Sequence, residues 1–317
     1  MKAEGRGSKS PLTDSIFRYP NNRYVALALL GATAGQGVVW YTGQFYALFF
    51  ITITLKLDYL NAYALVGLSL LIGTPMFVFF GWLSDKIGRL KIILAGCLIA
   101  AVTYFPLFAA LTHYVNPDLE AFQAKTKISI TVDQSTCNLH VFVGPWSTFS
   151  ECDRAKDAMT KSGLSFQEIA GAPGSKPVLA IGDKKIEGFD AKEGLPKLAA
   201  LLKEAGYPAT ADPKKVNWFM AEVILVIFLV YVTMVYGPIA AFLVELFPTK
   251  IRYTSMSLPY HIGNGWFGGM LPLLIIAISA WKGDIYAGFW YPIIVALMTV
   301  VIGFFFLKDT KDFDISR

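Results

Sequence analysis

Six long apolar runs constrain the fold of this chain more than any other feature of its sequence. A run of about 20 apolar residues is long enough to cross the hydrocarbon core of a bilayer as a helix. The chain is 55% hydrophobic and only 16% charged, which is too apolar for an ordinary soluble domain. We therefore predict an all-α membrane protein with six transmembrane helices, at Tyr24–Thr52, Ala62–Leu83, Ile92–His113, Trp218–Leu243, Met256–Ala280 and Tyr286–Leu307.

The distribution of charge orients these helices. Residues 118–215 hold 13 of the 28 Lys and Arg residues, which leaves 28 − 13 = 15 elsewhere. If the N-terminus is cytoplasmic, 13 of those 15 lie on the cytoplasmic side, and only Lys56 and Lys282 lie on the other. Short cationic flanks stay in the cytoplasm. The pattern predicts a multi-pass protein of the plasma (inner) membrane with both termini cytoplasmic. It attributes the net charge of +5 to these flanks and not to nucleic-acid binding.

The spans divide the chain into five segments. Residues 1–23 and 308–317 are cytoplasmic, while residues 24–113 and 218–307 hold helices 1–3 and 4–6. Residues 114–217 are then extracytoplasmic, and a loop of this length is too long for a plain connection. We expect an α/β insert with strands at Ile128–Val132, Asn138–Val143, Ser165–Ile169, Val178–Ile181 and Lys185–Phe189 and helices at Cys152–Lys161 and Leu195–Ala205.

Two cysteines of this insert allow two interpretations. Cys137 and Cys152 are symmetric about Gly144-Pro145, so a hairpin there would join them in a disulfide on an oxidising face. Alternatively, the stretch from Cys152 onward resembles the βαβ-ββα order of a glutaredoxin-like unit, in which a strand would separate the two cysteines. A redox site would have a second cysteine three residues before Cys152, where Phe149 stands. We favour the disulfide, and we interpret Cys97 as a packing residue.

Polar residues inside the spans indicate where a cavity could lie, because a polar group in hydrocarbon usually faces the bundle interior. The amides and indole of the first span share one helical face, which suits a zwitterion or a carboxylate. Interhelical packing is the alternative. His261 could couple protons or bind substrate, or simply pair with a neighbouring helix. The candidate cavity residues are Gln36, Trp40, Gln44, Tyr236, His261 and Asn264.

Two charged turns lie on the predicted cytoplasmic side, at Gly81–Lys91 and Glu245–Arg252. Each combines a carboxylate with cations at the end of a span. Such pairs can differ between conformations at the mouth of a moving bundle and so bias which side is open. A plain solvated turn is the alternative.

The first turn, Gly81-x3-Asp85-Lys-x-Gly88-Arg89-x-Lys91, resembles the loop signature of the major facilitator superfamily. The stretches from Pro238 to Ser255 and from Tyr260 to Gly265 look like its metabolite:proton symporter branch, which includes permeases for proline and glycine betaine, α-ketoglutarate and shikimate. The resemblance extends over all six spans. It implies alternating access without covalent chemistry, metal or organic cofactor. It also implies a cytoplasmic gate of Gly81, Asp85, Gly88, Arg89, Glu245 and Arg252.

Members of this family have twelve spans in two halves, and the six spans of this chain align with the second half. We therefore expect the C-terminal half of a proton-coupled symporter for a small organic acid or zwitterion. Its partners would be the metabolite, the proton, the lipid bilayer and an N-terminal six-helix half. One alternative is a membrane-anchored binding or sensing protein whose insert is the working part, and another is a redox enzyme built on Cys152.

Overall fold

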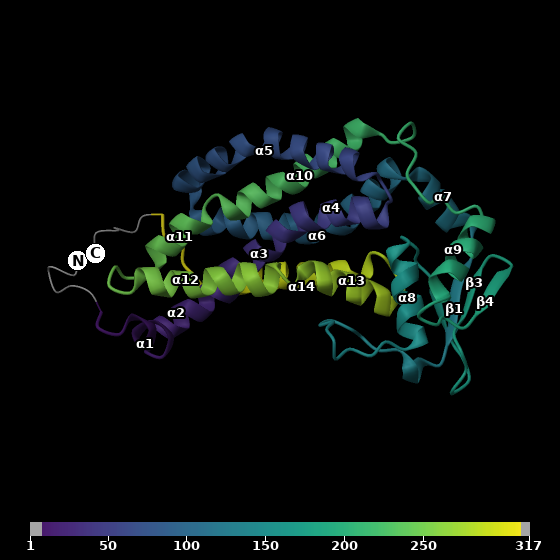
Figure 1. Ribbon diagram of the computed structural model, residues 1–317. Helices are drawn as coiled ribbons and strands as arrows, with labels where there is room; N and C mark the ends of the chain where they lie inside the picture. The colour runs from purple at the N-terminus through teal and green to yellow at the C-terminus, as the bar shows by residue number, and fades with distance from the viewer. Residues whose placement is uncertain (1–7, 312–317) are drawn as a thin grey trace.

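Six helical spans lie side by side in the computed structural model, which describes residues 8–311 (Figure 1). Each is long and apolar enough to cross a membrane. They confirm the six predicted spans and extend most of them by a few residues. Spans 1 to 6 are Asn21–Thr54, Tyr59–Ile87, Arg89–Val115, Trp218–Leu246, Arg252–Lys282 and Ala287–Phe306.

Several spans are built from more than one helical segment. Span 1 follows the short helix α1 (Pro11–Ile16) and contains α2 (Asn21–Ala28), α3 (Ala34–Tyr41) and α4 (Ala47–Phe49), separated by π-helical turns. Spans 2 and 3 are the single helices α5 (Tyr59–Ile87) and α6 (Arg89–Val115). Span 4 is divided at Gly237-Pro238 because proline lacks the backbone N–H that a continuous helix needs. The remaining segments are α10 (Trp218–Tyr236), α11 (Ile239–Leu246), α12 (Arg252–Ile262), α13 (Leu271–Lys282) and α14 (Trp290–Phe306).

Spans 1 and 5 touch through their backbones near the middle of the bundle. A Cβ atom added to Gly37 would lie 2.3 Å from the carbonyl oxygen of Gly263. Thr33 Oγ1 donates a hydrogen bond to the carbonyl oxygen of Pro259 at 2.7 Å beside this crossing. Small residues are what allow two membrane helices to approach this closely. The crossing fixes how the polar side chains of spans 1 and 5 meet.

The insert between spans 3 and 4 is a small mixed α/β unit at one end of the bundle (Figure 1). Its strands are β1 (Ile128–Val132), β2 (Gln167–Ala170), β3 (Val178–Ile181) and β4 (Lys184–Glu187), and its helices are α7 (Pro117–Lys125), α8 (Glu151–Lys161) and α9 (Gly194–Glu204). The strand order is β2-β1-β3-β4. β1 is parallel to β2 and antiparallel to β3, with Ile130 opposite Leu179. This is the βαβ-ββα order that the glutaredoxin resemblance implied.

The predicted strand Asn138–Val143 is wrong, because these residues lie in a loop. Cys137 before the loop and Cys152 in the first turn of α8 are joined by a disulfide, with 5.4 Å between their Cα atoms. The two interpretations of the cysteines therefore do not conflict, since no strand separates them. Sγ of Cys152 is occupied by this bond and its side chain is buried, so the structure offers no free thiol there.

Replacing both Cys137 and Cys152 with Ala is expected to lower the free energy of unfolding of the insert by about 3 kcal/mol, because the bond closes a loop of 15 residues in the unfolded chain. Thermal unfolding of the purified chain with and without reductant measures this. The variant should be insensitive to reductant. A wild-type midpoint that reductant leaves unchanged would contradict the prediction.

Candidate functional site

A buried ion pair joins the two charged turns at one end of the bundle. Arg89 is the first residue of α6, and Glu245 lies near the end of α11. Arg89 Nη2 lies 2.7 Å from Glu245 Oε1, and Arg89 Nε lies 2.7 Å from Glu245 Oε2. The two side chains are only 14% and 5% exposed. Arg89 also pairs with Asp85, whose side chain is 58% exposed. The structure thus brings together three of the six predicted gate residues.

The segment after span 6 closes over this pair. Thr310 Oγ1 donates to Glu245 Oε2 at 2.6 Å. The carboxylate of Asp309 accepts the backbone N–H groups of Arg89 and Leu90, at 3.2 and 3.0 Å. It therefore caps the amino end of α6, where unpaired N–H groups favour a negative charge. Sequence reasoning missed both residues.

Gly88 makes this cap possible. It has a φ of +119°, and an added Cβ atom would lie 2.4 Å from Asp309 Oδ2. Only glycine adopts this backbone conformation readily and leaves room for the carboxylate. The signal in the sequence was that a helix begins at Arg89 with no capping side chain before it. Gly81 differs, because an added Cβ there would meet no atom within 4 Å.

Arg252, the last predicted gate residue, begins α12. Its Nε donates to the carbonyl oxygen of Phe247 at 3.0 Å. This bond ties the start of span 5 back to the end of span 4. It places Arg252 in the same turn as Glu245.

An amide pair connects spans 1 and 5 in the middle of the bundle. Gln36 Nε2 donates to Asn264 Oδ1, and Asn264 Nδ2 donates to Gln36 Oε1, both at 3.0 Å. Gln36 is fully buried. Asn264 Nδ2 also donates to the carbonyl oxygen of Tyr260 at 3.0 Å. These amides hold two helices together in this conformation, which agrees with the packing alternative for Gln36.

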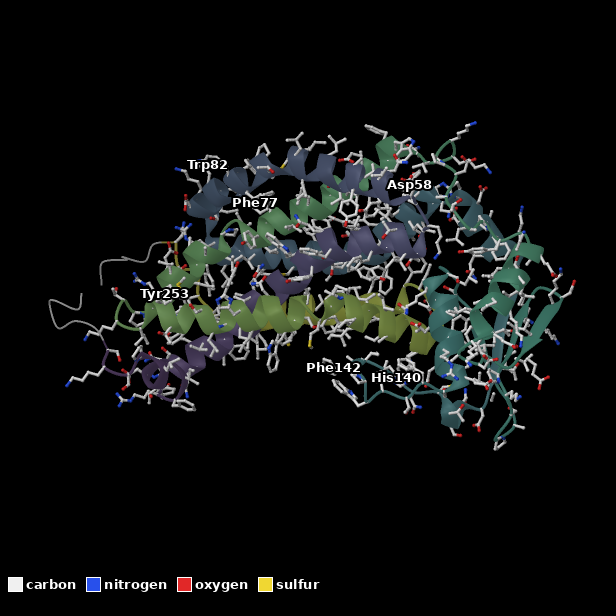
Figure 2. All side chains as sticks on the ribbon, in the orientation of Figure 1. Asp58, Phe77, Trp82, His140, Phe142 and Tyr253 are labelled. Atoms are coloured by element: carbon white, nitrogen blue, oxygen red, sulfur yellow. A yellow bond between two sulfur atoms is a disulfide. The ribbon has the colours of Figure 1, made fainter. Side chains whose placement is uncertain are left out.

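An aromatic cluster lies next to the amide pair. The rings of Trp40 and Tyr236 have centroids 4.0 Å apart. Tyr260 donates a hydrogen bond to the hydroxyl of Tyr236 at 3.1 Å. Phe77 of α5, labelled in Figure 2, meets Tyr236 edge-on with 5.9 Å between the ring centroids. Gln44 lies about two turns beyond Gln36 along span 1 and is half-buried.

His261 lies at the margin of this cluster, where its ring meets that of Tyr260 edge-on with 5.7 Å between the ring centroids. It is exposed and lines a separate hollow with Leu12, Ser257 and Trp266. The residues after it, 263–268, form a π-helical turn. This wider turn changes the angle between His261 and Asn264, so the two side chains point to different neighbours.

Replacing Gln36 with Leu is expected to cost about 1–2 kcal/mol, because it leaves the Asn264 amide without its partner in a buried site. The double variant with Asn264→Leu should recover part of that loss. Unfolding of the four proteins in detergent, arranged as a double-mutant cycle, gives the coupling energy. Additive losses would show that the two amides do not stabilise each other.

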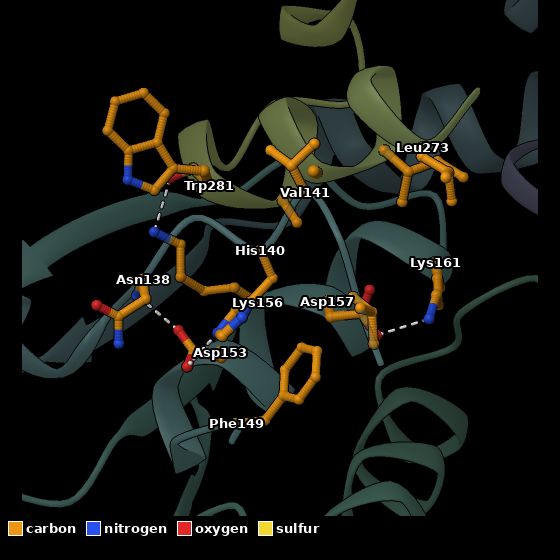
Figure 3. A pocket seen from close by; sticks show the side chains of 14 residues that line it. Asn138, His140, Val141, Phe149, Asp153, Lys156, Asp157, Lys161, Leu273 and Trp281 are labelled. Carbon is orange, nitrogen blue, oxygen red and sulfur yellow. Dashed lines mark hydrogen bonds and ion pairs between the residues drawn. The ribbon is translucent and has the colours of Figure 1, made fainter. Parts of the chain in front are cut away.

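The insert is fixed to the ends of spans 1 and 5. Lys156 Nζ in α8 donates to the carbonyl oxygen of Trp281 at 2.7 Å, where α13 ends (Figure 3). The backbone N–H of Phe166 donates to the carbonyl oxygen of Gly283 at 2.8 Å. On the other side, an added Cβ at Gly163 would lie 2.2 Å from the carbonyl oxygen of Thr54. The insert and the bundle are therefore in direct backbone contact.

His140 and Asp153 form the polar side of this junction (Figure 3). His140 Nε2 and Asp153 Oδ2 are 2.9 Å apart. Burial raises the pKa of Asp153, but the hydrogen bonds from the Asn138 N–H, from His140 and from Ser150 together lower it by more, so the net shift is downward. The carboxylate therefore stays ionised and keeps the disulfide-closed loop on α8.

Comparisons with known proteins find similarity to transporters over part of this chain. Residues 2–115, which include the first three spans, match the model of the Major Facilitator Superfamily. That family consists of membrane transporters and not of enzymes. Two proteins of Haemophilus influenzae are each 36% identical to this chain, over 77 and 93 residues. Both are described as metabolite transport proteins, a description that is itself provisional. The matched segments cover 24% and 29% of this chain but only 17% and 21% of those relatives. No solved structure matches this chain.

Proposed function

We propose, from the match of residues 2–115 to the transporter superfamily, that these six spans form the C-terminal half of a secondary active transporter. It carries a small organic acid or zwitterion together with protons. The two halves rock about a central site and open it to each side of the membrane in turn. The end of the bundle that holds Arg89 and Glu245 is the cytoplasmic side, because the cationic flanks lie there.

The buried Arg89–Glu245 pair is the observation that carries this proposal. Removing two charges from water is costly, and only their close pairing compensates for it. A pair of this kind is stable while the end of the bundle is closed and weakens when water enters. Asp85, which is more exposed, offers Arg89 a second carboxylate during that change. We assign the gate to these three residues together with Gly81, Gly88 and Arg252.

Span 5 supports the need for a second six-helix half. Its exposed residues include His261, Gly265 and Gly269. An imidazole facing lipid is unfavourable, whereas a groove of glycines fits another helix closely. In the most apolar 18-residue stretches of spans 2 and 5, only 22% and 28% of the residues are buried. We propose that the N-terminal half packs against spans 2 and 5.

Uptake into proteoliposomes tests this function. The chain is reconstituted alone and with a co-expressed N-terminal six-helix half, and labelled proline, glycine betaine, α-ketoglutarate or shikimate is offered with and without a pH gradient. Gradient-driven uptake that needs both halves is expected. Uptake by the chain alone would refute the half assignment, and uptake that ignores the gradient would refute proton coupling. Specific binding of these solutes without any uptake would favour the binding or sensing alternative.

A further inference from the structure

A cavity of about 650 Å³ lies between the insert and the end of span 1. One wall comes from the disulfide-closed loop and another from the segment that follows β4. The third side is Lys56, which stands between spans 1 and 2. Its main lining residues are Lys56, Phe149, Arg154, Lys161, Phe189 and Asp190.

Two cations in this cavity have no carboxylate partner. Lys56 Nζ donates to the carbonyl oxygen of Lys161 at 2.7 Å. Arg154 Nε donates to the carbonyl oxygen of Phe189 at 3.3 Å, and its Nη1 donates to that of Phe149. Within residues 8–311, neither side chain forms an ion pair. Both are half-buried, and burial lowers the pKa of the Lys56 ammonium. Lys56 and Arg154 therefore place two positive charges in the cavity without a directly bonded carboxylate.

The carboxylates of the cavity are already engaged. Asp157 pairs with Lys161 at 2.7 Å. Asp190 Oδ1 accepts the backbone N–H groups of Lys192 and Glu193, at 2.7 and 2.8 Å. Neither carboxylate forms an ion pair with Lys56 or Arg154, although the charge of Arg154 contributes, after the backbone hydrogen bonds from Glu193 and Lys192, to the lowered pKa of Asp190. An anion from solution would supply the missing partner for both cations.

Lys56 is held in a costly backbone conformation. Its φ of 60° is the single positive value among the non-glycine residues that the structure describes. Glycine is the residue that adopts this region without strain, and other residues pay on the order of 1 kcal/mol. Strain of this kind concentrates at functional sites. A lysine at this position keeps a backbone strain that glycine would relieve, which indicates that its side chain has a role here.

The cavity also has apolar walls. Phe149, Phe189 and Leu195 line it. A neighbouring hollow shares Lys161 and is lined by Phe49 and Ile53, which are exposed residues of span 1. The cavity thus stands at the insert end of the exposed face of span 1. Trp40 and Gln44 lie further along the same span.

We propose that this cavity binds a small carboxylate with an apolar body, held by Lys56 and Arg154, before it enters the bundle. The binding step stands on the cavity itself, and its role in loading rests on the proposed transport function. The apolar walls take the body of the ligand, and the two cations take its carboxylate through charge-assisted hydrogen bonds.

Calorimetric titration of the purified full chain with benzoate, and with its uncharged isostere benzamide, tests the site. Benzoate is expected to bind and benzamide is not. Lys56→Gly and Arg154→Gln should each weaken benzoate binding by about tenfold, because each removes one charged contact. Lys185→Gln, an exposed cation of β4 outside the cavity, is the matched control and should bind like the wild type.

Thermal unfolding separates the role in binding from a structural one. Lys56→Gly relieves the strained backbone, so its unfolding midpoint should not fall even though its benzoate binding is weaker. No saturable benzoate binding, equal binding of benzamide, or equal affinity in all variants would overturn the site. If benzoate binds as expected but uptake fails in proteoliposomes, the transport proposal falls and the binding site stands. If uptake succeeds without dependence on Lys56 and Arg154, the loading role falls and transport stands.

Discussion

Replacing Glu245 with Gln is expected to destabilise the folded bundle by about 3–5 kcal/mol, which is the usual cost of removing one partner of a buried ion pair. The substitution preserves shape but leaves the Arg89 guanidinium, only 14% exposed, without the charge that compensates it. The hydrogen bond from Thr310 to Glu245 Oε2 can still form to an amide oxygen, so the loss reports mainly on the charge. Unfolding in mixed micelles with increasing denaturing detergent measures the difference.

Asp85→Asn is the matched control for that experiment. Asp85 pairs with the same guanidinium, but its side chain is 58% exposed. An exposed ion pair contributes at most about 1 kcal/mol. A small effect of Asp85→Asn beside a large effect of Glu245→Gln is expected. Equal effects would mean that water reaches both carboxylates. This would contradict the proposal that Arg89 and Glu245 form a buried pair at the gate. With both halves present, Glu245→Gln should also reduce uptake by more than its effect on expression explains.

The length and hydropathy of the apolar runs were enough to predict most of the fold. An apolar run longer than about 20 residues has few alternatives to a membrane helix, so all six spans were predicted. The insert was predicted less completely. Alternating Leu139, Val141 and Val143 has the period of a strand, but this segment does not join the four-stranded sheet. The disulfide and the His140–Asp153 contact hold this segment as a loop instead.

Local sequence was enough to single out the residues of the buried ion pair, although not the contacts that surround it. Charges beside spans are scarce, which is why Asp85, Arg89 and Glu245 stood out. Asp309 was missed because it lies about 220 residues from α6 in the sequence, and the periodicity of a sequence does not reveal contacts between distant residues. Placing both His261 and Asn264 in one candidate cavity assumed α-helical spacing between them. The π-helical turn at residues 263–268 contains Asn264 but not His261, so α-helical spacing does not predict how these two side chains are oriented.

Replacing Gly88 with Ala is expected to cost about 2–4 kcal/mol, whereas Gly81→Ala should be neutral or slightly stabilising. At Gly88 a φ of +119° strains any other residue, and the added Cβ would push away Asp309, whose carboxylate caps α6. Gly81 lies inside α5, where Ala is the better helix former, and an added Cβ there meets no atom within 4 Å.

Unfolding of the chain alone, with Asp309→Asn as a third variant, checks both expectations. Most of the effect of Gly88→Ala should persist in the Asp309→Asn background if backbone strain dominates, and most should vanish if loss of the cap dominates. Similar losses for Gly81→Ala and Gly88→Ala would contradict the geometry of the turn. If Gly81→Ala leaves stability intact but abolishes uptake when both halves are present, the open space beside Gly81 is the place where the second half packs.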